Sequence, residues 1–282
     1  MIDWLLEPLD YPFMVRGLIA AVLVGIVCAV VGTYVVLRGM AFFGDALAHT
    51  ILPGVALGYL VGGGERRHLF WWGMLAALAS SFGIGMLSRH AKVKEDTAIG
   101  IIFAGMFALG IALISTVRNY TADLTHFLFG DILGVTPYDL LLTMIFSVLI
   151  MMTIILLYKE FMVVSFDPVL ARTLRLPVKL LDFLLLVLIA VVIVVSLQTV
   201  GIALMVAMLV TPAATSYILG LRLIWMMVVS SLFASLSGVI GLYLSYYIRV
   251  ASGAAIVLTA TAFFIMAWVW KTARRLTIQS ST

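Results

Sequence analysis

Charged residues are scarce in this sequence. Of its 282 residues, 11% are charged and 64% are hydrophobic, whereas a soluble domain carries about 25% charged and about 45 to 50% apolar residues. This composition excludes a water-soluble globule. Nine membrane spans of about 20 residues use about 180 positions and leave about 100 for connections, so no separate soluble catalytic or nucleic-acid-binding domain fits.

Several familiar signatures are also missing. The single cysteine, Cys28, excludes an intrachain disulfide. There is no Gly-x4-Gly-Lys-Ser/Thr loop for nucleotide phosphates, no His-Glu-x2-His pair and no Gly-x-Ser-x-Gly elbow. We therefore expect no enzymatic activity, and any ATP that drives this protein must be bound by another chain. The net charge is +4, but no run of five like charges suggests a nucleic-acid partner, and the opening residues lack the basic start of a cleaved signal peptide.

Long apolar windows predict an all-α polytopic protein of the lipid bilayer, with one transmembrane domain over residues 1–282. At a rise of about 1.5 Å per residue, nine windows are long enough to cross. They fall at residues 13–37, 41–61, 70–87, 97–117, 138–158, 180–197, 200–219, 223–245 and 254–270. Because only Gln198 and Thr199 separate the sixth window from the seventh, an alternative with eight spans and one broken or re-entrant element stays open. We favour nine.

Charge asymmetry predicts the orientation. If the loop at residues 89–94 is cytoplasmic, twelve of the 17 lysine and arginine residues lie in cytoplasmic loops and the tail. Cytoplasmic loops of membrane proteins carry an excess of such residues. With an odd number of spans, this places the N-terminus outside and the C-terminus inside.

Asp45 and His49 lie inside the second span, whereas nearly all other carboxylates and histidines lie in loops or at the ends of spans. His49 is about 12 Å along this helix, close to the middle of a hydrocarbon core about 30 Å thick. An ionisable group there costs at least about 2.5 to 3.5 kcal/mol, so two of them need a compensating role. Their spacing of four residues places both side chains on one helical face, where one ion can contact both.

Pro53 adds a third feature to this face, because a proline lacks the N–H that would bind the carbonyl of His49. A carboxylate, an imidazole and a carbonyl oxygen, without a thiolate, suit manganese, zinc or ferrous iron. We therefore favour a pathway for a divalent metal. Two alternatives remain: a hydrogen bond between Asp45 and His49 that pins helices together, and a proton relay, as in a proton-coupled secondary metal transporter.

The second half of the chain contains a comparable interruption, where Gly201 and Pro212 break an apolar helix. An interrupted span in each half indicates a substrate path near the midplane, although prolines also occur in membrane helices for packing reasons. Regularly spaced small residues predict close helix packing in the first span and the fourth. These residues are Gly17, Ala21, Gly25 and Ala29, and Gly100, Gly105 and Gly110.

The segment at residues 166–177 predicts a short cytoplasmic helix rather than a span. Asp167 suits the N-cap, Pro168 the first turn, and Pro177 closes the helix after about two turns. We expect a compact docking element for a cytoplasmic partner; a connector lying on the membrane surface is the alternative. Its candidate docking residues are Asp167, Pro168, Ala171, Arg172, Leu174 and Arg175.

On the predicted outer side, Asp123, His126 and Asp131 have two interpretations. They can attract cations to the mouth of a path, or they can simply be solvated loop residues.

Four stretches resemble the permease family of the zinc, manganese and iron ABC importers, a family related to the larger cobalamin and siderophore permeases. In the family's order they are residues 38–58, 126–134, 166–177 and 198–214. The first contains Gly-Asp-Ala-Leu-Ala-His-Thr-Ile-Leu-Pro-Gly and is highly specific. Two positions depart from the family pattern: Ala48 stands where serine is frequent, and Arg175 stands where a glycine commonly ends the short cytoplasmic helix.

The resemblance implies a type II ABC importer-like permease in the inner membrane of a prokaryote, with manganese, zinc or iron as substrate and no permanently bound cofactor. It implies that Asp45 and His49 are metal ligands on the path and that residues 167–176 form the coupling helix on the ATPase. The implied partners are two cytosolic ATPase subunits, an extracytoplasmic metal-binding protein and a second permease, most simply in a homodimer.

Overall fold

The computed structural model describes residues 6–63, 65–91, 93–116 and 132–279, and within these ranges it contains helices and no strand. The all-α prediction is confirmed. The elements are η1 (Glu7–Asp10), α2 (Pro12–Leu37), α3 (Ala41–Thr50), α4 (Leu52–Gly62), α5 (Arg66–His90), α6 (Glu95–Ser115), η2 (Ile132–Gly134), α8 (Pro137–Leu156), α9 (Tyr158–Phe166), α10 (Pro168–Thr173), α11 (Val178–Val200), α12 (Ile202–Ile218), α13 (Leu223–Ile248) and α14 (Ser252–Gln279).

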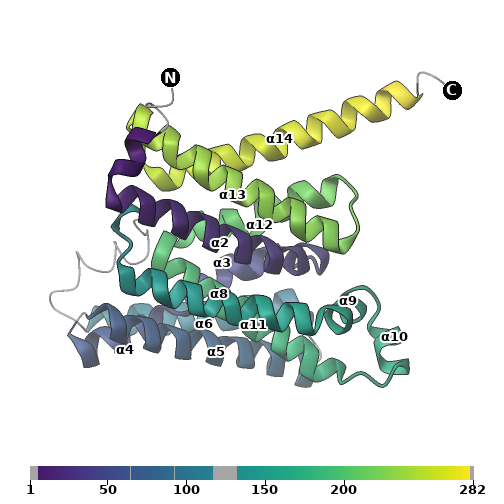
Figure 1. Ribbon diagram of the computed structural model, residues 1–282. Coiled ribbons are helices and arrows are strands. Elements are labelled where there is room, and N and C mark those ends of the chain that lie inside the picture. Colours follow the sequence, from purple (N-terminus) through teal and green to yellow (C-terminus); the bar gives the residue numbers. More distant parts are fainter. Residues whose placement is uncertain (1–5, 64, 92, 117–131, 280–282) are drawn as a thin grey trace.

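The long helices form one bundle with a common direction (Figure 1). Helix α2 begins at one end of the bundle and α14 ends at the other, the end where α10 lies. Among the described residues, eight spans are long and apolar enough to cross a membrane, with α3 and α4 together forming one of them. Helix α12 is a shorter apolar helix of 17 residues, or about 25 Å.

Gly201 separates α12 from α11. Its φ of 80° and ψ of 171° lie in a region that glycine adopts without the steric penalty of a side chain. The seventh apolar window is therefore a helix of its own, which packs against α2, α13 and α14. A ninth crossing through this shorter helix stays a prediction.

Helix α2 is central to the bundle, and its small residues explain why. A Cβ on Gly25 would lie 3.3 Å from Cβ of Ala234, and a Cβ on Gly238 would lie 3.0 Å from Cβ of Ala21. These contacts bring α2 and α13 together without intervening side chains, as the small-residue spacing predicts. In α6, by contrast, a Cβ on Gly100 or Gly105 would meet nothing within 4 Å among the described residues. The predicted packing face of α6 is thus wrong within the single chain at these two positions.

The region after α8 contains a helix that the sequence did not predict. Helix α8 ends at Leu156, and α9 follows after one residue and leads directly to α10. Helix α9 packs on α2, α8 and α11. Helix α10 is consequently attached to the bundle on both sides, through α9 before it and α11 after it.

The closest approach of α2 to α12 gives a test of this packing. A Cβ on Gly32 would collide with the backbone carbonyl of Leu209, which cannot move aside as a side chain can. We expect Gly32→Ala to lower the free energy of unfolding by about 1 to 3 kcal/mol and to lower the melting temperature in detergent. Gly253→Ala is the matched control, since its nearest neighbour is Cβ of Leu204 at 4.0 Å. Equal melting temperatures for both variants would contradict the packing.

Candidate metal site and coupling segment

Asp45 and His49 lie on one face of α3. Nε2 of His49 is 3.8 Å from Oδ1 of Asp45, and the side chains are 34% exposed for His49 and 42% exposed for Asp45. The imidazole faces α6, with its centroid 6.0 Å from the ring of Phe103 and 5.7 Å from the ring of Phe107. The pair is therefore neither sealed in a dry contact nor fully exposed: one ion can reach both groups from the surface of the chain.

A single chain offers few ligands at this place. Among the described residues, no group of three or more His, Cys, Asp or Glu side chains is arranged to hold a metal ion. A structural zinc site usually has four protein ligands. Two side chains on one helix are more suited to a transient contact, or to a site that another molecule completes.

The backbone at Pro53 corrects one expectation. Helix α3 ends at Thr50, Ile51 forms the junction, and Pro53 lies in the first turn of α4, where a missing N–H does no harm. The carbonyl of His49 accepts the backbone N–H of Ile51. The predicted freed carbonyl is therefore wrong, because the chain breaks the helix instead of leaving a gap in it.

The interrupted segment of the second half lies close to α3. Gly201 caps α12 and Pro212 lies inside it, and both residues are buried. A Cβ on Gly44, next to Asp45, would lie 2.8 Å from Cδ2 of Leu209. Helix α12 thus packs against the helix that carries the candidate ligands, and a role for Gly201 and Pro212 in a metal path stays a prediction.

Helix α10 begins as its sequence predicts. Oδ1 of Asp167 accepts the backbone N–H of Val169 at 3.0 Å and that of Leu170 at 2.9 Å, and Pro168 occupies the first turn. Apolar side chains cover the exposed face of this helix and its flanks, while Ala171, within the helix, is fully buried. The exposed set comprises Phe166, Val169, Leu170 and Leu174.

Helix α10 ends differently from the prediction. It stops at Thr173, before Pro177, and Arg175 adopts a left-handed conformation with φ of 57°. The N–H of Arg175 binds the carbonyl of Arg172, and the N–H of Leu176 binds that of Ala171. This is the Schellman arrangement, in which glycine is the usual residue with positive φ. The same arrangement closes α2, where Gly39 has φ of 69°.

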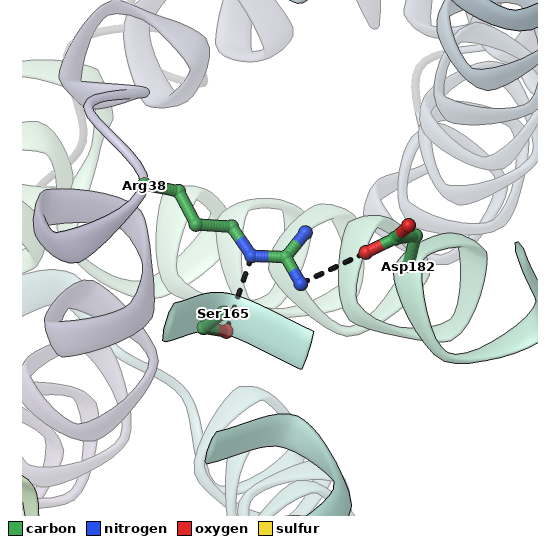
Figure 2. Close-up of polar contacts among 3 residues, drawn as sticks. All are labelled: Arg38, Ser165 and Asp182. Carbon is green, nitrogen blue, oxygen red and sulfur yellow. Dashed lines mark hydrogen bonds and ion pairs between the residues drawn. The ribbon is translucent and has the colours of Figure 1, made fainter. Parts of the chain in front are cut away.

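Three polar contacts were missed by sequence reasoning. Arg38 binds Ser165 and Asp182 (Figure 2). Buried Asp139 accepts a hydrogen bond of 2.7 Å from Nε2 of Gln198. The available signal was a carboxylate near the start of an apolar window, since Asp182 and Asp139 both lie within the first three residues of a predicted span.

The candidates for the outer mouth, Asp123, His126 and Asp131, lie outside the described residues.

Comparison with known proteins identifies the family. The model of the ABC 3 transport family matches residues 10–271. The chain belongs to this family. The permease is 46% identical to the manganese transport system membrane protein MntC of Listeria monocytogenes over 93% of this chain and 92% of that protein. It is 40% identical to a protein of Haemophilus influenzae described as a probable iron transport system membrane protein, over 97% and 99% of the two chains.

A solved structure agrees with this assignment. PsaBC from Streptococcus pneumoniae, in complex with a Fab, matches the permease with a TM-score of 0.81 and 39% identity over 95% of each chain. The permease is thus a multi-pass membrane protein with the fold of an ABC transport subunit. The resemblance inferred from the sequence motifs is confirmed.

The end of α10 gives a second test. A left-handed conformation costs an L-residue about 1 to 2 kcal/mol, so Arg175→Gly relieves strain that the permease carries. We expect slower amide hydrogen exchange at residues 174–176. Arg172→Gly, a change of the same residue type in the body of α10, should accelerate that exchange because glycine destabilises a helix by about 1 kcal/mol relative to alanine. Faster exchange in Arg175→Gly would contradict the strained ending.

Proposed function

We propose that this chain is the transmembrane permease subunit of an ATP-driven importer for manganese or ferrous iron, and that the ion passes Asp45 and His49. The observation that carries the proposal is this pair of side chains, one helical turn apart and accessible, within an apolar span of an ABC 3 family permease. Carboxylate and imidazole together suit both metals. Relatives named for manganese and for iron support the same substrate class.

The pair has too few ligands to hold an ion by itself. Within the described chain two side chains contribute, whereas these metals bind more ligands than two. A second copy of the permease, or water, supplies the others. A second copy of the permease also shields the pair from lipid. Two half-exposed ionisable side chains that face lipid cost several kcal/mol. Only 17% of the most apolar part of α6, beside the pair, is buried within the chain, which leaves this side open for a second copy.

An incomplete site has an advantage for transport. Conduction requires binding that is favourable enough to admit an ion and weak enough to release it. Two ligands from each copy, or two ligands and water, meet this requirement better than a closed four-ligand site. In this proposal an extracytoplasmic metal-binding protein delivers the ion, and ATP hydrolysis in cytosolic partner subunits opens the path to the other side.

The contact with the ATPase subunits is assigned to α10 and its flanks. The excess of lysine and arginine favours a cytoplasmic position for this end of the bundle, with the N-terminus outside and the C-terminus inside. The apolar side chains on α10 lie beyond the spans and are exposed. The exposed fraction is 47% for Leu170 and 68% for Val169. An exposed apolar patch outside the membrane is typical of a docking surface.

Substitution of the ligand pair tests the proposed path. We expect Asp45→Asn and His49→Gln each to lower ATP-driven uptake of radioactive manganese or iron at least about tenfold, since even indirect changes at metal sites cost that much. The measurement uses proteoliposomes containing the permease with its ATPase and metal-binding protein. Asp96→Asn, at an exposed carboxylate in the first turn of α6, is the control and should transport normally.

The outcome also separates the rival mechanism. Uptake at the unsubstituted rate in the variant with both changes would overturn the assignment of the ligands. Uptake by the permease alone, driven by a pH gradient without ATP, would instead identify a proton-coupled secondary transporter.

Disruption of the docking surface tests the coupling role. Val169→Asp places a carboxylate in an apolar contact, where it has no partner to offset its desolvation. We expect the affinity for the ATPase subunits to fall at least about tenfold, measured by co-purification and by titration in detergent. Leu6→Asp changes a residue of similar exposure, 51%, at the opposite end of the bundle and should leave that affinity unchanged. Undiminished binding by Val169→Asp would remove α10 from the interface.

A further inference from the structure

One side chain, Arg38, contacts two separate elements, α9 through Ser165 and α11 through Asp182 (Figure 2). Its Nε donates a hydrogen bond of 3.2 Å to Oγ of Ser165, and its Nη2 lies 2.9 Å from Oδ1 of Asp182. The side chain of Arg38 is 10% exposed and that of Asp182 is 31% exposed. The guanidinium is therefore largely withdrawn from water; it donates one hydrogen bond to Ser165 and forms an ion pair with Asp182 that lacks hydrogen-bond geometry.

The two acceptors bracket residues 166–177, the proposed coupling segment. Ser165 lies in the last turn of α9, just before Asp167 caps α10, and Asp182 lies near the start of α11, just after the segment ends. Arg38 itself caps α2 and lies in the short turn that leads into α3, the helix of Asp45 and His49. A single guanidinium thus joins both flanks of the coupling segment to the base of the helix with the candidate ligands.

The chemistry of arginine makes this junction sensitive to geometry. Its nitrogens are fixed in one plane, so it keeps the hydrogen bond to Ser165 and the ion pair with Asp182 together only when these two residues hold a particular relative position. A shift of α9 relative to α11 removes one of the acceptors. Lysine keeps the charge but offers a single nitrogen on a flexible stem, which cannot reproduce the planar fork.

The surroundings allow the ion pair to open. Asp182 lines a cavity of about 110 Å³ together with Met40, Ser88 and Glu95. A water molecule needs about 10 to 15 Å³ of such space, so water can reach the carboxylate when the guanidinium withdraws. Met40, the N-cap of α3, lines the same cavity, so the base of α3 adjoins the place where the pair opens.

We propose that Arg38 is the positioning residue that links movement of the coupling segment to α3, and so to the metal path. This inference rests on the proposed function. When the ATPase subunits displace α10, the flanks at Ser165 and Asp182 shift, and Arg38 carries that shift into the turn before α3. Helix α11 also packs directly on α3, so a shift of the turn between α2 and α3 takes place relative to α11.

The test measures coupling rather than stability. The complete complex, with its ATPase and metal-binding protein, is reconstituted in proteoliposomes, and manganese uptake and ATP hydrolysis are measured together. For Arg38→Lys and Ser165→Ala we expect assembly, a melting temperature close to that of the unsubstituted complex, and continued ATP hydrolysis. We expect the number of ions transported per ATP to fall about tenfold in Arg38→Lys, a size typical of coupling effects, and less in Ser165→Ala.

The control is Arg222→Gln. Arg222 is exposed and lies in the connection between α12 and α13, at the same end of the bundle, so its loss should leave the ratio of ions to ATP unchanged. An unchanged ratio of ions to ATP in Arg38→Lys, including equal falls in uptake and hydrolysis, would overturn the inference. If Arg38→Lys fails to assemble, Ser165→Ala becomes the deciding variant, since it removes only the hydroxyl that accepts the hydrogen bond from Arg38. An unchanged ratio of ions to ATP in Ser165→Ala then overturns the inference.

The same experiment separates this inference from the proposed function. If the unsubstituted complex takes up no manganese or iron with ATP, the proposed function fails, and the inference fails with it. If the unsubstituted complex transports and the Asp45 and His49 variants do not, the proposed function stands. An unchanged ratio in the Arg38 and Ser165 variants then rejects only the role of Arg38.

Discussion

An ionisable side chain in hydrocarbon costs at least about 2.5 to 3.5 kcal/mol unless another group or water satisfies it. Several polar contacts among the described residues join different helices. Arg38 joins α2 to α9 and α11, and Gln198 joins α11 to Asp139 of α8. Asp45 and His49 differ from these, because their nearest charged partner lies on their own helix, at 3.8 Å. That difference is what makes them candidates for a ligand from outside the chain.

Helix α11 is the element on which these contacts converge. It packs on α2, α3, α5 and α8, and its polar contacts lie near its two ends, at Asp182 and Gln198. Between these ends its side chains are almost entirely apolar and largely buried. The proposed coupling segment, residues 166–177, directly precedes α11, so the order of elements along the chain places the proposed ATPase contact next to a helix that packs on several others.

The sequence predicted the spans, the N-cap of α10 and the close packing of α2, because each depends on local pattern: apolar length, an Asp-Pro pair, and small residues at every fourth position. It failed where the outcome depends on partners distant in sequence. Asp182 and Asp139 gave only a weak signal, since a carboxylate at the start of a span is usually solvated. The carbonyl of His49 was judged from an ideal helix, whereas the chain breaks at Ile51. Gly100 and Gly105 show that a small-residue spacing does not say whether the neighbouring surface belongs to the same chain.

The central claim is that Asp45 and His49 bind the ion as it passes, and electron–nuclear double resonance of Mn²⁺ held in the assembled complex tests it most directly. The account predicts a hyperfine coupling from an imidazole nitrogen that disappears in His49→Gln while the complex stays intact. A manganese spectrum without nitrogen coupling, or one whose nitrogen coupling persists unchanged in His49→Gln, would contradict it.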